Sequence, residues 1–473
     1  MEKLFKLKEN GTDVRTEIIA GATTFVTMAY IIAINPNLLT GFDVGSPLWN
    51  SVFIATCLSA FLGTLFMALL ANKPFAMAPG MGLNSFFAMV VANIVTLTGT
   101  TYTESFQAAL CITLIEGILF LIVSLAGIRE KIVKAIPRNI RLGISPAVGL
   151  MLMHIGFGSN AQIFDENGNA YFVMSDFFGA LTPSILRDKM GNSYPVMVLT
   201  VITMLTGFFI IIVLAKKEIK GAVILGMFAA SVIYWAGEAL FLGINPFAPL
   251  TQASFIPPVD DMLATTFFKF NFPVFIKMGW FAVITVVITF AMIDMFDTLG
   301  SLVGAAHKAG LIDKDGNMPA MKEALTADAL GTIVGSAVGT STVTTFVESA
   351  SGVMAGGRTG LTALTTGVLF LLSIFLSPIV SLIPPAATSP ALIYVGILML
   401  SLLKGINFDD ISESAPIFIM LITMPISGSI GHGIGLALIS YTFIKLLTGE
   451  FRDVPIPTFV LSIIFLIKFF VVF

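Results

Sequence analysis

The sequence has few charged residues and shows none of the basic patterning that nucleic-acid binding needs. Only 11% of its 473 residues are charged and 56% are hydrophobic, whereas a soluble globular chain carries about 25% charged residues. The charges balance to a net −3, so there is no basic stripe to neutralise phosphates, and we exclude a nucleic-acid partner. The mean hydropathy of +0.95 predicts a chain whose solvent is the lipid bilayer.

Cysteine and histidine are nearly absent, with two and three copies. Cys57 and Cys111 lie in apolar runs and are expected to be small buried side chains rather than disulfide partners. His154 and His432 lie in separate glycine-rich runs, so no metal site is predicted. No nucleophile–base pair is recognised either. We therefore expect neither a cofactor nor an enzymatic activity.

Apolar stretches of about 20 residues, the length that crosses the hydrocarbon core as a helix, recur along the chain. The sequence predicts about fourteen: Ile18–Pro36, Ser51–Ala71, Ala78–Val95, Ser105–Gly127, Ser145–Ser159, Pro195–Ala215, Gly221–Leu242, Gly279–Gly304, Thr326–Gly339, Glu348–Gly357, Thr362–Ile383, Ser389–Leu403, Ala415–Ile430 and Gly431–Leu447. Spans three and ten are too short or too rich in glycine for plain helices, and we expect a short extended stretch and a half-helix in each. Pro455–Phe473 either crosses or lies along the interface.

Basic residues orient these spans, because short cytoplasmic loops carry the excess of Lys and Arg. They cluster in residues 1–17, in 129–141 after span four, and in 216–220 after span six. The N-terminus is therefore predicted to be cytoplasmic, in a multi-pass protein of the cytoplasmic membrane. Three loops are expected to face outward: Asn37–Asn50, Asn160–Tyr194 and Gly243–Lys277.

The two halves of the chain resemble each other. Residues 136–153 read IPRNIRLGISPAVGLMLM and residues 383–399 read IPPAATSPALIYVGILM. A second match pairs Thr24-Phe25 with Thr289-Phe290, and a weaker one pairs the stretch from Phe75 with the stretch from Phe346. Seven spans per half would invert the second copy, and inverted repeats with broken helices at the midplane are typical of transporters. Chance likeness of apolar runs is the alternative.

Carboxylic acids inside spans are functional candidates, because each costs about 2.5–3.5 kcal/mol in the bilayer. Asp294 and Asp297 are neighbours on one helical face, which Thr298 extends. Two close carboxylates cannot both ionise cheaply, so one should hold a proton near neutral pH, as a proton-coupled carrier requires. A structural hydrogen-bonded pair is the alternative. Glu116 has no visible partner and is interpreted as structural.

The interruptions in spans three and ten supply further candidates. Glu348 follows a β-branched run and precedes small residues, where helix N–H groups attract an acceptor; it is interpreted as a ligand-facing carboxylate, with helix capping as the alternative. Asn84 follows the break at Pro79-Gly80 and offers a donor and an acceptor; an interhelical hydrogen bond is its alternative. Phe75 and Phe346 could stack on a flat ligand, although packing explains either. Arg358 is expected at the cytoplasmic end of the second half-helix.

Four motifs carry a resemblance that covers essentially the whole chain. They are GATTFVTMAYIIAINP at 21–36, MAPGMGLNSFF at 77–87, MIDMFDTLGSLVG at 292–304 and GTSTVTTFVESASGVMAGGRTGLTAL at 339–364. Together they resemble the nucleobase cation symporters of the xanthine/uracil permease superfamily, specifically its adenine, guanine and hypoxanthine permeases.

The resemblance implies an all-α polytopic fold of two inverted seven-span repeats, divided into a substrate-carrying core domain and a gate domain. The expected divisions are a cytoplasmic segment 1–17, core 18–127, gate 128–243, extracellular loop 244–277, core 278–384, gate 385–447 and a C-terminal apolar segment 448–473. The resemblance also implies an elevator-like movement of the core against the gate, and a homodimer formed through the gate.

The resemblance also assigns roles by matching position. It implies that Asp294, Glu348 and Asn84 bind a purine nucleobase, with Phe346, Phe75 and Thr298 beside them. Asp297, together with Asp294, resembles the proton-coupling position. Aspartate in span eight, and Thr298 where uracil carriers have histidine, favour purines over pyrimidines. The expected function is proton-coupled purine import. The alternatives are a related fourteen-span carrier of another nucleobase or of an inorganic anion, and sodium as the coupling ion.

Overall fold

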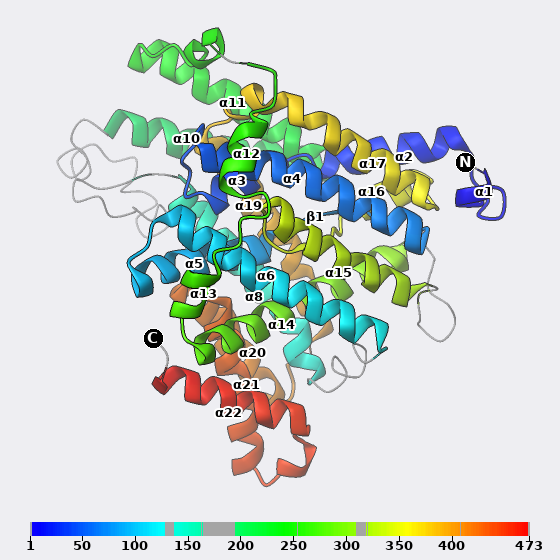
Figure 1. Cartoon of the computed structure of the whole chain (residues 1–473), viewed down its shortest axis with the longest axis vertical. Helices are drawn as coiled ribbons and strands as arrows, with labels where there is room; N and C mark the ends of the chain where they lie inside the picture. The colour runs from blue at the N-terminus through cyan, green and yellow to red at the C-terminus, as the bar shows by residue number, and fades with distance from the viewer. Residues whose placement is uncertain are drawn as a thin grey trace.

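The protein is almost entirely helical in the residues that the computed structural model describes, which are 2–127, 137–161, 163, 194–252, 254–308, 318, 320–406 and 408–471. The first half contains α1 (Glu2–Phe5), α2 (Val14–Met28), α3 (Ile31–Leu39), α4 (Pro47–Phe66, continued by a π-helix Met67–Ala71), β1 (Met77–Pro79), α5 (Met81–Thr98), α6 (Tyr102–Leu125), α8 (Arg138–Phe157), α10 (Tyr194–Lys216) and α11 (Ala222–Gly237, continued by a π-helix Glu238–Leu242). Figure 1 shows their arrangement.

The second half begins with two short helices, and the order of helices and the strand that follows them resembles that of the first half. It contains α12 (Val259–Thr265), α13 (Phe272–Lys277), α14 (Trp280–Lys308), α15 (Met321–Val338), β2 (Val343–Thr345), α16 (Ser349–Met354), α17 (Gly360–Leu372), α18 (Ser377–Val380), α19 (Pro385–Met399), α20 (Ile411–Ser427), α21 (Ile430–Leu447) and α22 (Ile456–Val471). Each of the fourteen predicted segments coincides with a helix or an interrupted helix.

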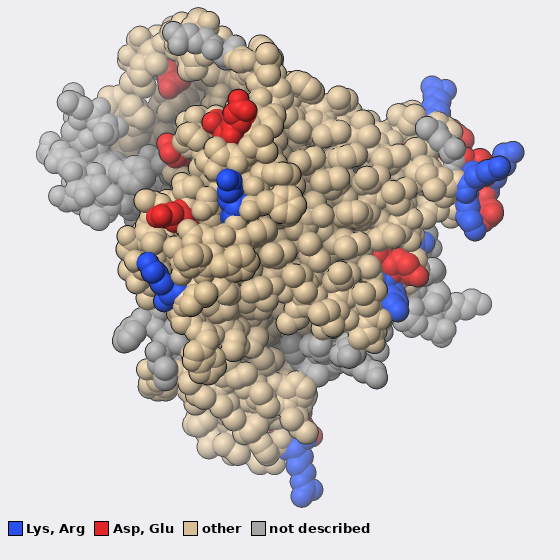
Figure 2. Space-filling model, viewed as in Figure 1, with Lys and Arg blue, Asp and Glu red and all other residues tan. Residues whose placement is uncertain are grey.

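The helices have the length and surface of membrane spans. Ten of the described helices are long and apolar enough to cross a membrane, and large side chains such as Phe209, Leu240 and Leu447 are exposed on them. Figure 2 shows the charged side chains of one face mostly toward its left and right margins, with a broad uncharged band between. Such a band matches the hydrocarbon layer, where charge is costly. The chain is a multi-pass membrane protein.

The helices pack in two groups. One contains α2 to α6 and α14 to α17, and the other contains α8, α10, α11 and α19 to α22. The groups meet where α14 touches α8, α21 and α22, where α8 touches α5, where α19 touches α3 and where α11 touches α2. α12 and α13 pack on α4 and α6, so the segment predicted as a loop at 244–277 contains two helices held against the first group. The predicted loop Asn160–Tyr194 lies mostly outside the described residues.

The two extended stretches pair with each other near the centre of the molecule (Figure 1). β1 and β2 are antiparallel, with Met77 opposite Thr345, Ala78 opposite Thr344 and Pro79 opposite Val343. The bilayer core contains no water, so the backbone N–H and C=O groups of an extended segment need hydrogen-bond partners within the protein. Here β1 and β2 provide these partners for each other.

The extended stretches are therefore confirmed in spans three and ten. The short half-helix is present in span ten, where α16 has six residues, whereas in span three the helix after the strand, α5, has 18 residues. The strands β1 and β2 occupy corresponding places in the two repeats, but Phe75 precedes β1 whereas Phe346 follows β2. The weak sequence match that pairs Phe75 with Phe346 is therefore offset from the correspondence of the strands.

Spans one and five differ from their predicted extents in ways that matter for the site and for the boundary between the two groups. Span one is not one continuous helix: α2 ends at Met28, α3 begins at Ile31, and the N–H of Ala33 bonds the carbonyl of Tyr30 (3.2 Å) in a tighter turn. The fifth segment begins at Arg138 rather than Ser145, because the long side chain of Arg138 can carry its charge to the membrane surface from the first helical turn.

The repeated sequence at 136–153 and 383–399 forms the crossing of α8 and α19. A Cβ atom added to Gly149 would lie 2.6 Å from the carbonyl oxygen of Gly396, and one added to Gly396 would overlap the carbonyl oxygen of Gly149. The two backbones therefore touch. Small residues permit this close approach of helices in membranes, so the glycines of the repeat fix how α8 and α19 cross.

Candidate functional site

Residues 340–346, called here the hub segment, contain β2 and contact a different element at nearly every position. The hydrogen bonds, in chain order, are Asn35 Nδ2 to Thr340 Oγ1 (3.1 Å), Ser341 Oγ to Asn84 Oδ1, Thr342 Oγ1 to Glu116 Oε2 (2.8 Å), Thr332 Oγ1 to the Val343 carbonyl (3.1 Å), a Thr344–Thr298 hydroxyl pair (2.7 Å) and the Phe346 N–H to the Ala76 carbonyl (3.0 Å). The hub segment thus joins α3, α5, α6, α15, α14 and the stretch before β1.

Asn84 ties the start of α5 to the hub segment. Its amide nitrogen donates to the Pro79 carbonyl (3.3 Å), and its amide oxygen accepts from the Ser341 hydroxyl. The side chain is fully buried. Pro79 lies in β1 and Ser341 lies outside the helices, so these bonds are not the interhelical bond given as the alternative. The role of Asn84 toward a ligand stays a prediction.

Asp294 and Thr298 belong to a buried cluster with a third residue, Asp328 of α15. The Thr298 hydroxyl lies 2.9 and 3.1 Å from the two carboxylate oxygens of Asp328 and 3.2 Å from Asp294 Oδ1. All three side chains are buried. Sequence reasoning missed Asp328, although an acid within the apolar run Thr326–Gly339 was a sufficient signal.

The cluster geometry suits one extra proton. The Thr298 hydroxyl has one proton to donate and two lone pairs that accept, yet it contacts Asp328, Asp294 and Thr344. If it donates to Asp328 and accepts from Thr344, its contact with Asp294 is satisfied when that carboxyl carries a proton. Two buried carboxylates around one hydroxyl also repel each other unless one is neutral.

Asp297 faces the break in span three. A Cβ atom added to Gly80 would lie 3.6 Å from Asp297 Oδ2 and 2.6 Å from Thr344 Cγ2. The glycine between β1 and α5 therefore lets α14 and β2 approach. Asp297 is half-buried, and its carboxylate stands beside the amino-terminal end of α5.

Glu348 receives a hydrogen bond from a residue that sequence reasoning missed. The Tyr30 hydroxyl donates to Glu348 Oε1 at 2.7 Å. Tyr30 is 1% exposed and lies in the interruption of span one. Glu348 precedes α16 but makes no side-chain capping bond there, so the capping alternative is not supported. Tyr30 gave no local signal, because the interruption that places it was itself not predicted.

The two candidate aromatic residues lie in different surroundings. Phe346 is buried in the main apolar cluster, whereas Phe75 packs in a separate cluster with Met67, Leu302 and Val353. Their stacking on a ligand stays a prediction. A ring pair that was not anticipated, Phe86 of α5 and Phe290 of α14, has centroids 4.6 Å apart and joins these helices next to Asn84 and Asp294.

Two charged residues outside the cluster are accounted for. Glu116, which was interpreted as structural, accepts a hydrogen bond from the Thr342 hydroxyl (2.8 Å), a partner that is distant in the sequence. The guanidinium group of Arg358 donates to the Val353 and Gly357 carbonyls, both at 2.7 Å, and so lies at the end of α16 as expected.

Cys57 and Cys111 are free and buried. In the described ranges, no three His, Cys, Asp or Glu side chains are grouped as metal ligands.

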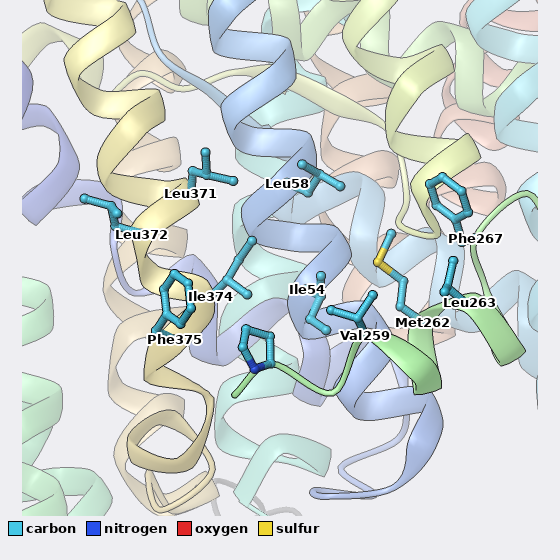
Figure 3. Close-up of a pocket in the computed structure, with 11 residues that line it drawn as sticks. Ile54, Leu58, Val259, Met262, Leu263, Phe267, Leu371, Leu372, Ile374 and Phe375 are labelled. Carbon is cyan, nitrogen blue, oxygen red and sulfur yellow. The ribbon is translucent and has the colours of Figure 1, made fainter. Parts of the chain in front are cut away.

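An apolar pocket of about 540 Å³ lies away from these residues (Figure 3). α4 contributes Ile54 and Leu58, α12 contributes Met262, and the chain after α17 contributes Phe375. Each residue of its lining is apolar, and none belongs to the predicted site. It offers nothing that would orient a polar ligand, so the carboxylate cluster is the better candidate site.

The chain is similar to known proteins along its whole length. The sequence profile of the xanthine/uracil permeases, described as a permease family, matches residues 15–436. The chain is 38% identical to the adenine permease AdeP of Escherichia coli (strain K12), over 99% of this chain and 95% of AdeP. It is also 38% identical to the guanine/hypoxanthine permease PbuO of Bacillus subtilis (strain 168), over 99% of this chain and 100% of PbuO.

A solved structure has the same fold. The transmembrane domain of the cyanobacterium bicarbonate transporter BicA superposes with a TM-score of 0.63 at 15% identity, covering 89% of this chain and 97% of that one. At that identity the likeness concerns the fold alone. It agrees with the architecture predicted from the sequence, including the core and the gate.

Proposed function

Since the chain belongs to the xanthine/uracil permease family, we propose that it imports a purine nucleobase, namely adenine, guanine or hypoxanthine, together with protons. Members of this family are permeases, so the protein is a membrane transporter and not an enzyme. The observation that carries the proposal is the group of buried or half-buried carboxylates around the strand pair, formed by Asp294, Asp297, Asp328 and Glu348. A neutral purine presents N–H donors to carboxylates and ring nitrogens to donors such as the Asn84 amide.

The acidic site favours a purine over an inorganic anion. Anions bind where Arg, Lys or free helix N–H groups converge. Here Asp297 stands beside the start of α5, so an anion would meet a carboxylate at that helix end. AdeP and PbuO, by their names, carry adenine and guanine or hypoxanthine.

Coupling follows from the charge of the carboxylates. A proton taken up by Asp297 or Asp294, the two carboxylates predicted to couple transport to protons, removes a charge inside the protein, so the loaded site moves through the membrane at lower cost. A ligand and a proton that both stabilise the moving state drive each other's transport.

We assign the helices α2–α6 and α14–α17 to the core domain, and the helices α8, α10, α11 and α19–α21 to the gate domain. The N-terminus is assigned to the cytoplasmic side. We also propose a homodimer, formed through the gate domain.

The boundary between these groups supports relative movement. Gly82, two residues after the break in span three, faces Val148 of α8: an added Cβ atom would lie 2.6 Å from Val148 Cγ1. Gly82 has no side chain, so at this point the backbone of α5 lies directly against Val148. The absence of a side chain here favours the proposed shift of the core against the gate, because nothing projects from the core at this point.

Purine uptake should depend on the proton gradient. In cells that express the chain, we expect saturable uptake of labelled purine that collapses when a protonophore is added. Asp297→Asn should still bind purine but should no longer accumulate it against a gradient, because the amide cannot carry the proton. The assay compares labelled adenine, guanine, hypoxanthine, uracil and xanthine, with sodium replaced by choline as the control. Uptake that follows sodium and ignores the protonophore would overturn the coupling assignment.

Removing the Tyr30 hydroxyl should weaken purine binding. Tyr30→Phe leaves Glu348 Oε1 without its 2.7 Å donor, and a hydrogen bond to a charged group contributes about 1.5–3 kcal/mol. We expect KM to rise about tenfold or more with protein abundance unchanged. The matched control is Tyr102→Phe, which removes a tyrosine bond to the Leu39 carbonyl (2.8 Å) in another part of the core. Equal KM values for the two variants would contradict the role of Tyr30.

A further inference from the structure

Glu17, near the start of span one, has a carboxylate that is buried and fully engaged. It is 0% exposed and accepts five hydrogen bonds from the start of α17. The donors are the Arg358 N–H (2.8 Å), the Thr359 N–H and hydroxyl (3.2 and 2.8 Å), and the Thr362 N–H and hydroxyl (3.1 and 2.6 Å). Nothing in the local sequence singles it out, since it lies among the charged residues at the start of the chain.

This arrangement stabilises the α16–α17 turn, residues 355–359. A buried carboxylate is tolerated only when its oxygens are hydrogen-bonded, and the amino-terminal end of a helix such as α17 favours negative charge. Arg358 contributes its backbone N–H to Glu17 and uses its guanidinium on the Val353 and Gly357 carbonyls at the end of α16. Glu17 and Arg358 thus hold the turn from both sides.

Span one contacts α16 along its whole length. Beyond the Glu17 contact at the turn, Thr27 and Ser351 share a hydroxyl hydrogen bond of 2.9 Å, and Tyr30 bonds Glu348 at the other end. A Cβ atom added to Gly352 would lie 2.7 Å from the Ala20 carbonyl and would overlap the Thr24 hydroxyl. The backbones of α2 and α16 are therefore in contact between these bonds.

The half-helix depends on this support. α16 has six residues, and a helix that short is not stable by itself because nucleation costs more than a few hydrogen bonds return. Its position must therefore come from neighbours. A binding group is held in place only when the residues around it fix its geometry closely.

We propose that Glu17 is a positioning residue for the substrate site: it anchors the cytoplasmic end of α16 and thereby places Glu348 at the other end. The assignment rests on the proposed function only for what Glu348 binds. Glu17 itself touches no ligand in this scheme. Its effect on transport passes through the α16–α17 turn and the length of α16.

Glu17→Gln is the direct test. Three of the five donors are backbone N–H groups, which cannot accept, so an amide nitrogen placed there would face another donor. Glu17→Asp keeps the carboxylate and should restore part of the effect. The matched control is Glu104→Gln: Glu104 also accepts from an N–H and a hydroxyl at a helix start, those of Thr101 (3.0 and 2.8 Å), but in the exposed first turn of α6.

Two measurements on the full-length protein decide the matter. Hydrogen exchange in lipid nanodiscs should become faster in Glu17→Gln across 349–354 as well as at 358–362, and remain unchanged in Glu104→Gln. In cells, Glu17→Gln should raise the KM for purine about tenfold at unchanged abundance, and Glu17→Asp should raise it less.

The contrary results are distinct. Two results would overturn the proposal, because they would mean that Glu17 only stabilises the turn. The first is faster hydrogen exchange confined to residues 358–362. The second is a KM equal to that of the unmodified protein, with reduced abundance of the variant. If the unmodified protein and Glu104→Gln both take up no purine, the proposed function fails. The exchange comparison then still decides whether Glu17 positions α16.

Discussion

Replacing Glu348 by glutamine is expected to abolish purine accumulation. Glu348 is an acceptor that Tyr30 orients at 2.7 Å, and the amide would present a donor where the proposed ligand and Tyr30 both donate. A site built on hydrogen bonds rejects such a mismatch strongly, because buried groups are left without partners. We expect the uptake efficiency, kcat/KM, to fall at least about 100-fold. The measurement is uptake of labelled purine, with membrane abundance determined in parallel.

The variant Glu348→Asp tests whether the charge of the carboxylate is sufficient or the length of the side chain also matters. It keeps the carboxylate but shortens the side chain, so we expect an intermediate loss, with Tyr30→Phe in the Glu348→Asp background adding little further because the same contact is already broken. Normal transport by Glu348→Gln would remove Glu348 from the site. The anion-carrier alternative should then be tested with labelled bicarbonate and sulfate.

The second large effect is expected at the crossing of α8 and α19. Gly149→Ala and Gly396→Ala each place a methyl group against the opposing backbone carbonyl, and backbone cannot move aside as a flexible side chain can. Overpacking costs about 1–3 kcal/mol even against side chains, so we expect at least that loss of stability. The variants should melt at lower temperature in detergent and yield less monodisperse protein.

Gly405→Ala is the matched control for this crossing. Gly405 follows the same helix, and an added Cβ atom would meet only the Leu142 side chain, at 3.4 Å. The double variant Gly149→Ala, Gly396→Ala should lose less than the sum of the single losses, since both act on one contact. Unchanged melting in both single variants would show that the crossing tolerates separation.

The sequence predicted the fold well because the bilayer restricts the chain so strongly. A spanning segment must be apolar, about 20 residues long and internally hydrogen-bonded, so each predicted segment coincides with a helix. The breaks at Pro79-Gly80 and before Glu348 were visible because proline, glycine and β-branched residues interrupt helices locally. The break before Ile31 was missed because Ala29 and Tyr30 carry no such signal.

The site was predicted in part, and the missing residues share a cause. Asp294, Asp297, Thr298 and Glu348 were found because polar residues in apolar runs stand out. Tyr30 and Glu17 were missed because their importance lies in partners more than 300 positions away, which no local pattern reports. The weak repeat match at Phe75 also shows that composition can misalign apolar segments when the correct correspondence lies in two strands.

The hub segment has a consequence for how the protein is made. Asn35, Asn84 and Glu116 of the first half find hydrogen-bond partners 305, 257 and 226 positions later, at residues 340–342. At a synthesis rate of about 5–20 residues per second, these buried polar groups wait on the order of ten seconds to a minute after they leave the ribosome. During that time the first helices hold polar side chains that their own half does not fully satisfy. We therefore expect that the early helices must be kept from lipid and from wrong partners until the second half has been made.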